Sequence, residues 1–215
     1  MTIQAGARMP SGSLKQLTAE GPKEITTDAL FGGKTVVLFS VPGAFTPTCD
    51  AKHLPGYVQH ADALKAKGVD TIACMAVNDM FVMGAWGKSS NVGDKVMMLA
   101  DGNGDYTKAL GLELDARGFG MGVRGKRFAI IVKDGVATHV NVEAGGEFKV
   151  SAAEYVLGQL EWLSATNALL SRGVRGAYPS PRTSAPMRSR SRSRPKVSSC
   201  RGRSTSRSIP TIATS

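Results

Sequence analysis

The chain has 215 residues and a formal net charge of +10, from 27 Lys and Arg against 17 Asp and Glu. Residues 172–215 hold eleven of the basic residues and none of the acidic ones, which leaves 16 basic against 17 acidic groups in the rest. The positive charge therefore gives no reason to assign nucleic-acid binding to the larger part of the chain. Three cysteines are too few for a secreted disulfide framework, and no apolar stretch reaches the roughly 18 residues that span a membrane.

Composition divides the chain into two parts. We expect one α/β domain over residues 1–171, which is long enough to bury a proper core, and a disordered basic tail over 172–215. The N-terminus, Met1–Gly6, has neither a charged segment before an apolar one nor an Arg/Ser-rich transit pattern. We therefore expect a cytoplasmic protein without a membrane segment.

Within the first part, strand-like and helix-like periodicities alternate, which is typical of an α/β sheet. Strands are predicted at 35–40, 70–77, 96–100, 127–132 and 136–142, and helices at 48–67, 79–88, 105–110 and 151–170. The Asp134-Gly135 pair predicts a tight turn between the last two strands. Pro55 is expected to bend the first helix, and Ser151 with Glu154 forms a capping-box pattern at the start of the last.

The most informative segment follows the first predicted strand and reads Pro42-Gly43-Ala44-Phe45-Thr46-Pro47-Thr48-Cys49. A Pro/Gly turn places a cysteine at the start of a predicted helix, where unpaired N–H groups and the positive end of the helix dipole favour a thiolate. The hydroxyl of Thr46, three residues earlier, can turn toward the same sulfur. The segment is therefore suited to activating a thiol.

The order Pro-x-x-x-Thr-x-x-Cys at Pro42, Thr46 and Cys49 resembles the active-site signature of peroxiredoxins, and the longer string resembles their type II, peroxiredoxin-5-like branch. The resemblance extends over about residues 1 to 165 and implies a thioredoxin-like fold with a central mixed β-sheet between helices. Its further motifs are His53-Leu54-Pro55-Gly56, Val77-Asn78-Asp79, Phe81-Val82-Met83, Ala85-Trp86-Gly87-Lys88, Ala100-Asp101-Gly102, Lys126-Arg127-Phe128 and Asn141-Val142-Glu143.

The resemblance implies a thiol-dependent peroxidase that reduces hydrogen peroxide and alkyl hydroperoxides. Cys49 would be the peroxidatic nucleophile, Thr46 would hydrogen-bond the thiolate or the peroxide, Arg127 would supply positive charge, and Pro42 would shield the site from water. From the residues alone, other interpretations stay open: an inert buried thiol at Cys49, a helix N-cap at Thr46, and a surface ion-pair partner at Arg127.

A sulfenic acid on Cys49 needs a second thiol to return to the cycle. Cys74, 25 residues downstream, is the candidate, since its spacing is similar to that of plant-type members of the branch. The animal-type alternative, a cysteine just before the last helix, is excluded because that region reads Phe148-Lys149-Val150-Ser151. The alternative for Cys74 is a small buried residue of a core strand. A disulfide between a helix start and a mid-strand position would require local unfolding, without which a small thiol such as glutathione would resolve Cys49.

No cofactor and no metal are expected. Gly120-Met121-Gly122-Val123-Arg124-Gly125 matches a dinucleotide-binding pattern but precedes a predicted strand rather than a helix. The electrons are expected to come from glutathione/glutaredoxin or thioredoxin, and the resemblance suggests a homodimer. A thiol redox sensor that relays oxidation to other proteins would share the first chemical step and remains an alternative.

The C-terminal tail contains the run Arg188-Ser189-Arg190-Ser191-Arg192-Ser193-Arg194 and half of the ten prolines. Such tracts can bind nucleic-acid phosphates, and serine phosphorylation can reverse their charge. RNA or an acidic partner is therefore one interpretation, against a solvated extension without a role or an error at the end of a gene model. Cys200 is a spare thiol in this tail.

Overall fold

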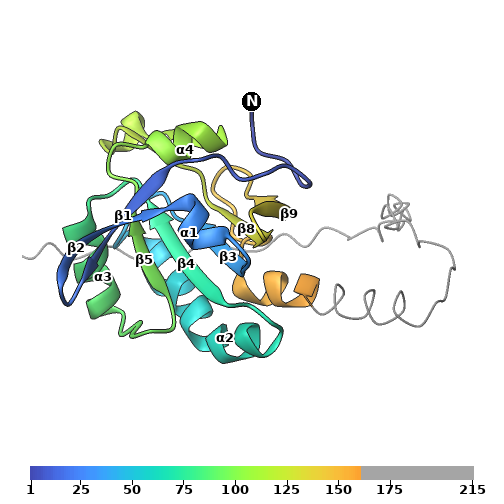
Figure 1. Cartoon of the computed structure of the whole chain (residues 1–215). Helices are drawn as coiled ribbons and strands as arrows, with labels where there is room; N and C mark the ends of the chain where they lie inside the picture. Colours follow the sequence, from blue (N-terminus) through green and yellow to red (C-terminus); the bar gives the residue numbers. More distant parts are fainter. Residues whose placement is uncertain (161–215) are drawn as a thin grey trace, which may run out of the picture. The chain divides into compact units, whose positions relative to one another are not determined.

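The computed structural model of the chain describes residues 1–160, which form a seven-stranded sheet with helices on both faces (Figure 1). The strand order is β2-β1-β5-β4-β3-β8-β9. The strands of this sheet are β1 (Ser13–Thr18), β2 (Gly21–Thr26), β3 (Thr35–Ser40), β4 (Thr71–Ala76), β5 (Met97–Ala100), β8 (Phe128–Lys133) and β9 (Val136–Val142). Strands β6 (Glu113–Asp115) and β7 (Val123–Gly125) form a separate two-stranded sheet. The helices are α1 (Thr27–Phe31), the π-helix η1 (Cys49–His53), α2 (Leu54–Ala66), α3 (Met80–Ser89), α4 (Asp105–Leu110), the 3₁₀-helix η2 (Arg117–Phe119) and a helix at 153–160.

The main sheet is mixed, as predicted. β3, β4 and β5 run parallel, whereas β8 pairs antiparallel with β3, β9 with β8, and β1 with β5. The β8–β9 connection is the predicted two-residue turn, in which Asp134 and Gly135 both have positive φ. All five predicted strands are therefore present.

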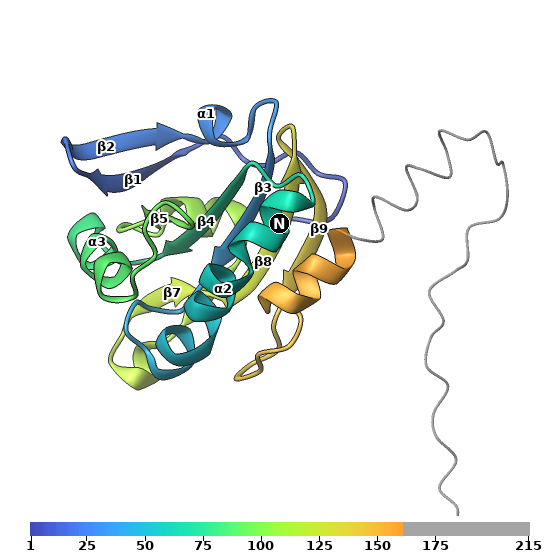
Figure 2. The same ribbon diagram turned by 90° about the horizontal axis from the view of Figure 1, so that it is seen from below.

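Two apolar clusters, one on each face of the sheet, form the core. Alternate residues of β3 belong to different clusters: Val37 and Phe39 face α2, α3 and the helix at 153–160, whereas Val36 and Leu38 face α1 and α4. These four side chains are fully buried, which explains why β3 reads as a continuous apolar run. The helix at 153–160 lies beside α2 (Figure 2).

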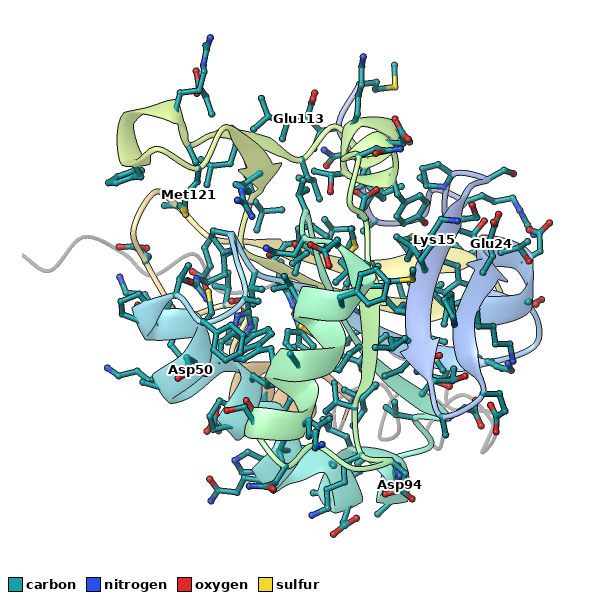
Figure 3. All side chains as sticks on the ribbon, turned by 90° about the vertical axis from the view of Figure 1, so that its left-hand side faces the viewer. Lys15, Glu24, Asp50, Asp94, Glu113 and Met121 are labelled. Carbon is teal, nitrogen blue, oxygen red and sulfur yellow. The ribbon has the colours of Figure 1, made fainter. Side chains whose placement is uncertain are left out.

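Several short elements were not predicted, because their sequences carry little hydrophobic periodicity. β1 and β2 form an edge hairpin that buries little more than Leu14, and Lys15 of β1 faces Glu24 of β2 at 3.7 Å (Figure 3). α1 has five residues and follows its N-cap Thr26, whose side chain accepts the N–H of Ala29. β6 and β7 have only three residues each.

The predicted helix at 48–67 begins differently from the expectation. Its first turn, η1, is a π-helix in which the N–H of Leu54 reaches back to the carbonyl of Cys49, and the regular α-helix begins only at Leu54. Pro55 lies in the first turn of α2, where its missing N–H costs least. The chain therefore accommodates Pro55 by a wide turn ahead of it.

The predicted capping box at the last helix is wrong. The backbone N–H and the hydroxyl of Ser151 both donate to Glu143, and Glu154 instead contacts His60 of α2 at 3.2 Å. Glu143, eight residues before Ser151, accepts these hydrogen bonds because the segment before the helix folds back onto the end of β9. This helix is described only to residue 160, so the rest of the 151–170 prediction lies outside the described residues, as do the 172–215 tail and Cys200. Within residues 1–160, every helix is too short or too polar for a membrane crossing.

Candidate active site

The loop between β3 and η1 is held by the next strand of the sheet. Asn78, just beyond the end of β4, accepts the N–H of Ala44 through its side-chain oxygen at 3.0 Å. Phe45 takes a positive φ of 59°, which is uncommon for an aromatic residue and marks a local backbone cost of about 1 kcal/mol or more. Its ring rests against Trp86 of α3. The loop therefore has a defined shape that directs Thr46 and Cys49 inward.

Cys49 begins η1 and is completely buried. The hydroxyl oxygen of Thr46 lies 2.8 Å from its sulfur and 2.9 Å from the carbonyl oxygen of Gly43. A hydroxyl has one proton, so it can donate to Gly43 while accepting the S–H, and can turn that proton to the sulfur when Cys49 is a thiolate. Thr46 is thus matched to both protonation states of the thiol.

Arg127 approaches the same sulfur from a segment 78 residues further along the chain. In the β3–β8 pair, Ser40 lies opposite Phe128, which sets the residue before Phe128 beside the loop that leaves β3. The Nη2 atom of Arg127 lies 3.3 Å from Sγ of Cys49. Register, rather than sequence spacing, brings these two residues together.

Arg127 is itself held by two aromatic side chains. Its Nη1 atom donates to Nδ1 of His53 at 2.9 Å, and its guanidinium carbon lies 5.8 Å from the centre of the Phe148 ring, within the range of a cation–π contact. Phe148 also packs edge-on against His53 at 5.0 Å. The guanidinium therefore has a fixed orientation toward Cys49.

His53 is buried and uncharged. Burial, together with the positive charge of Arg127, lowers its pKa to about 3, although a hydrogen bond with the Ser151 carbonyl opposes the shift. The neutral ring donates from Nε2 to the Ser151 carbonyl at 3.1 Å and accepts from Arg127 at Nδ1. The two partners thus assign the tautomer.

A cavity of about 210 Å³ opens beside these residues. Its wall includes Pro42, Thr48 and Arg127, together with Leu114, Lys126 and residues 143–147. Pro42 is half-buried and forms part of this wall. A small polar molecule that entered here would contact Arg127, whereas Cys49 is not part of the cavity wall.

Cys74 lies in the middle of β4, between Phe39 of β3 and Met98 of β5, and is completely buried. It belongs to the same apolar cluster as Cys49, and both cysteines are free. Burial and, less strongly, the neighbouring Cys49 raise the pKa of the Cys74 thiol. In this conformation Cys74 is an inert core thiol.

The structure thus joins Cys49, Thr46 and Arg127, with Pro42 at the rim, and leaves Cys74 in the sheet. No role was predicted for Glu143, which lies in one of the motifs that resemble the family, or for Phe148. His53 lies in the motif His53-Leu54-Pro55-Gly56, one helical turn after Cys49, and its predicted role is packing and hydrogen bonding beside the site. Residues 1–160 contain no group of three or more His, Cys, Asp or Glu side chains arranged to hold a metal ion.

Comparison with known proteins identifies the family of the chain. The sequence model of the Redoxin family matches residues 4–157. Peroxiredoxin-2B of Arabidopsis thaliana is 48% identical over 159 residues, which cover 74% of this chain and 98% of that protein. Peroxiredoxin-2E, chloroplastic, of the same plant is also 48% identical, over 74% of this chain and 70% of its own.

Among solved structures, reduced Prx3 of Vibrio vulnificus in complex with H₂O₂ superposes with a TM-score of 0.72 at 54% identity. The match covers 74% of this chain and 99% of that one. It identifies the mixed sheet and its flanking helices as a thioredoxin-like peroxiredoxin fold. The chain therefore belongs to the Redoxin family and is a peroxiredoxin, a thiol-dependent peroxidase.

Proposed function

We propose that Cys49 is the peroxidatic thiol and that its substrates are hydrogen peroxide and alkyl hydroperoxides. The observation that carries this assignment is the convergence of the Thr46 hydroxyl and the Arg127 guanidinium on one buried sulfur. The complex of the Vibrio vulnificus relative with H₂O₂ supports the peroxide as substrate.

The chemistry is an in-line displacement. The thiolate of Cys49 attacks one peroxide oxygen, an S–O bond forms as the O–O bond breaks, and the departing oxygen takes a proton to leave as water or alcohol. Arg127 and Thr46 supply hydrogen-bond donors to the attacking sulfur and to the charge that builds on the departing oxygen. Pro42 limits the access of water to the site. The product on the enzyme is a sulfenic acid.

The enzyme returns to the thiol by reduction from outside, and glutathione/glutaredoxin and thioredoxin are the proposed electron sources. Attack by Cys74 on the sulfenic acid would give a disulfide and release water, but its place within β4 requires part of the core to open first. Direct attack by glutathione needs access to Cys49 alone. Cys49 is itself completely buried, so this reaction needs local exposure of η1 but no opening of β4. We therefore propose that an external thiol reduces the sulfenic acid first.

We also propose that the chain forms a homodimer in the cytoplasm. Phe45 and Phe81 are 51% and 60% exposed, and Phe45 contacts Trp86, which lies in the same helix as Phe81. Large apolar side chains near a covered active site suit a contact between two copies. Sedimentation of the wild type and of Phe81→Glu tests this, since the variant should be monomeric.

Peroxide consumption with each reductant tests the proposed function. Cys49→Ser should abolish turnover, because a hydroxyl is a far weaker nucleophile than a thiolate, while Cys74→Ser should retain the first oxidation step. Normal turnover by Cys49→Ser would refute the assignment. Oxidation of Cys49 that no thiol reductant can reverse would favour the alternative, a redox sensor.

A further inference from the structure

Glu143 closes a loop directly next to the active site. It follows the end of β9, and its backbone N–H donates to the carbonyl of Arg127 at 3.0 Å. Its side-chain Oε1 accepts three hydrogen bonds: from the N–H of Lys149 at 2.6 Å, and from the N–H and the hydroxyl of Ser151 at 2.8 Å each. One carboxylate oxygen therefore fixes the far end of the 144–150 loop to the strand end.

Ser151 connects the contacts of Glu143 to two buried side chains of the core. Its residue is fully buried, and its carbonyl oxygen accepts from Nε2 of His53 at 3.1 Å and from the hydroxyl of Tyr57 at 2.9 Å. These donors belong to η1 and α2, the helical segments that begin with Cys49. Both acceptor sites of the carbonyl are occupied, so its position determines where the two rings lie.

The next link is the imidazole. Because Nε2–H of His53 donates to the Ser151 carbonyl, Nδ1 has the free lone pair that accepts a hydrogen bond from Nη1 of Arg127. Nη2 is then left to donate to Cys49. A displaced carbonyl would release the ring, and a released ring would no longer hold the guanidinium. Each contact in this series is 3.3 Å or shorter.

We propose that Glu143 is a positioning residue for the peroxidase reaction, acting through Ser151 and His53 on the guanidinium of Arg127. The proposal rests on the proposed function, in which Cys49 attacks the peroxide. Glu143 does not touch the sulfur in this arrangement. Its contribution is geometric, through the oxygen that accepts the three donors.

A purely electrostatic role predicts the opposite effect. A carboxylate near the site disfavours a second negative charge on Cys49, so removal of the charge alone would promote the thiolate. Partial burial opposes the ionised form of Glu143, but the hydrogen bonds from Ser151, Lys149 and Val150 outweigh it and lower its pKa. The ionised carboxylate of Glu143 is thus stabilised by the same hydrogen bonds that hold the 144–150 loop.

Two substitutions separate geometry from charge. Glu143→Gln keeps an acceptor oxygen and removes the charge, whereas Glu143→Ala removes both. We expect Glu143→Ala to lower the second-order rate constant of Cys49 with hydrogen peroxide by roughly tenfold to a hundredfold, as misplacement of a catalytic group does, and Glu143→Gln to restore most of that loss. Equal losses in the two variants would overturn the geometric role.

Glu154→Ala is the matched control. Glu154 also links the helix at 153–160 to α2, through His60, but this exposed contact does not involve Ser151. It should leave the rate constant unchanged. A loss equal to that of Glu143→Ala would mean that any loosening of the two helices suffices, and would overturn the specific role of Glu143.

A double-mutant cycle with Arg127→Gln tests the route. If Glu143 acts through Arg127, Glu143→Ala should have no further effect on the rate constant in the Arg127→Gln background, whereas fully additive losses would overturn the proposal. Should Glu143→Ala fail to fold, Ser151→Ala, which removes one of the three donors, takes its place in the cycle. Failure of the proposed function itself would look different, because Cys49→Ser would then consume peroxide at the wild-type rate.

Discussion

Nη1 of Arg127 lies 2.9 Å from Nδ1 of His53, so a charged group and a titratable base share one partly buried hydrogen bond. The contact is favourable only while the imidazole is neutral, since a protonated ring would offer a donor to a donor. Burial and the charge of Arg127 keep the ring neutral, with a pKa of about 3. The same arrangement orients the guanidinium toward Cys49 and makes the fold sensitive to acid.

The first prediction concerns the pH dependence of stability. The pKa of His53 is about 3 in the fold and about 6.5 in the unfolded chain, so between these values the unfolded state binds more protons. His53 should therefore cost stability as the pH falls below about 6.5, by roughly 1.4 kcal/mol per pH unit at most until about pH 3. Above pH 6.5 it should have no such effect.

Urea unfolding of the wild type and of His53→Gln at pH 7, 6 and 5 measures this directly. Glutamine cannot titrate, and the carboxylates and the half-buried His139 contribute equally to both chains. The difference in unfolding free energy between the two should shrink as the pH falls. A constant difference would mean that His53 is protonated in the fold or exposed to solvent.

Arg127→Lys should lower the rate constant with peroxide nearly as much as Arg127→Gln does. The guanidinium contacts His53 with one nitrogen and Cys49 with the other, and a lysine ammonium has a single nitrogen that lacks this fork geometry. We expect the rate constant with peroxide to fall by about 2 orders of magnitude or more, in line with the loss of a donor to developing charge. Stopped-flow measurement of peroxide reduction checks it, and a fall below about threefold would show that charge alone suffices.

Thr46→Val tests the hydroxyl beside the sulfur. Valine has nearly the same shape but cannot donate to Cys49 or to the Gly43 carbonyl, so we expect the rate constant with peroxide to fall about tenfold to a hundredfold. Thr46→Ser keeps the hydroxyl and is the control, with near-normal rates. Similar rates in all three chains would reduce Thr46 to a packing residue.

Much of the fold could be predicted because its strands carry strong patterns. β3, β4 and β8 are apolar runs buried on both faces, and the Asp134-Gly135 turn is a local signal. The edge hairpin of β1 and β2 buries too few side chains to produce a pattern, and the π-helical start at Cys49 depends on how the loop is held from outside the helix. Local sequence contains neither kind of information.

The site residues also fall into those that local sequence predicts and those that only the tertiary structure brings together. Thr46 and Cys49 are three residues apart, so local spacing brings them together. Arg127 meets Cys49 only through the β3–β8 register, and family resemblance, not spacing, indicated it. The contacts of Glu143 and Ser151 depend on the return of the chain from β9 to the last helix, which replaced the expected capping box.

Asn78→Ala should weaken the loop that carries the site. Its side chain accepts the N–H of Ala44, next to Phe45 with its positive φ, so the loop would lose an external constraint on a costly conformation. We expect a loss of about 1–3 kcal/mol in unfolding free energy, with a lower peroxide rate constant. Asn78→Asp retains the acceptor and should recover the rate; no recovery would assign the effect to packing.

The last prediction concerns Cys74. Because its thiol is buried between β3 and β5, a disulfide with Cys49 should form only in molecules in which the core around η1 has opened. After one equivalent of hydrogen peroxide, the rate of Cys49–Cys74 disulfide formation should therefore rise with urea at concentrations well below the unfolding midpoint. Peptide mapping under non-reducing conditions follows the product, and a rate independent of urea would contradict the requirement for opening. In turnover, Cys74→Ser should impair thioredoxin-supported reduction more than glutathione-supported reduction, and equal effects on both would remove Cys74 from the cycle.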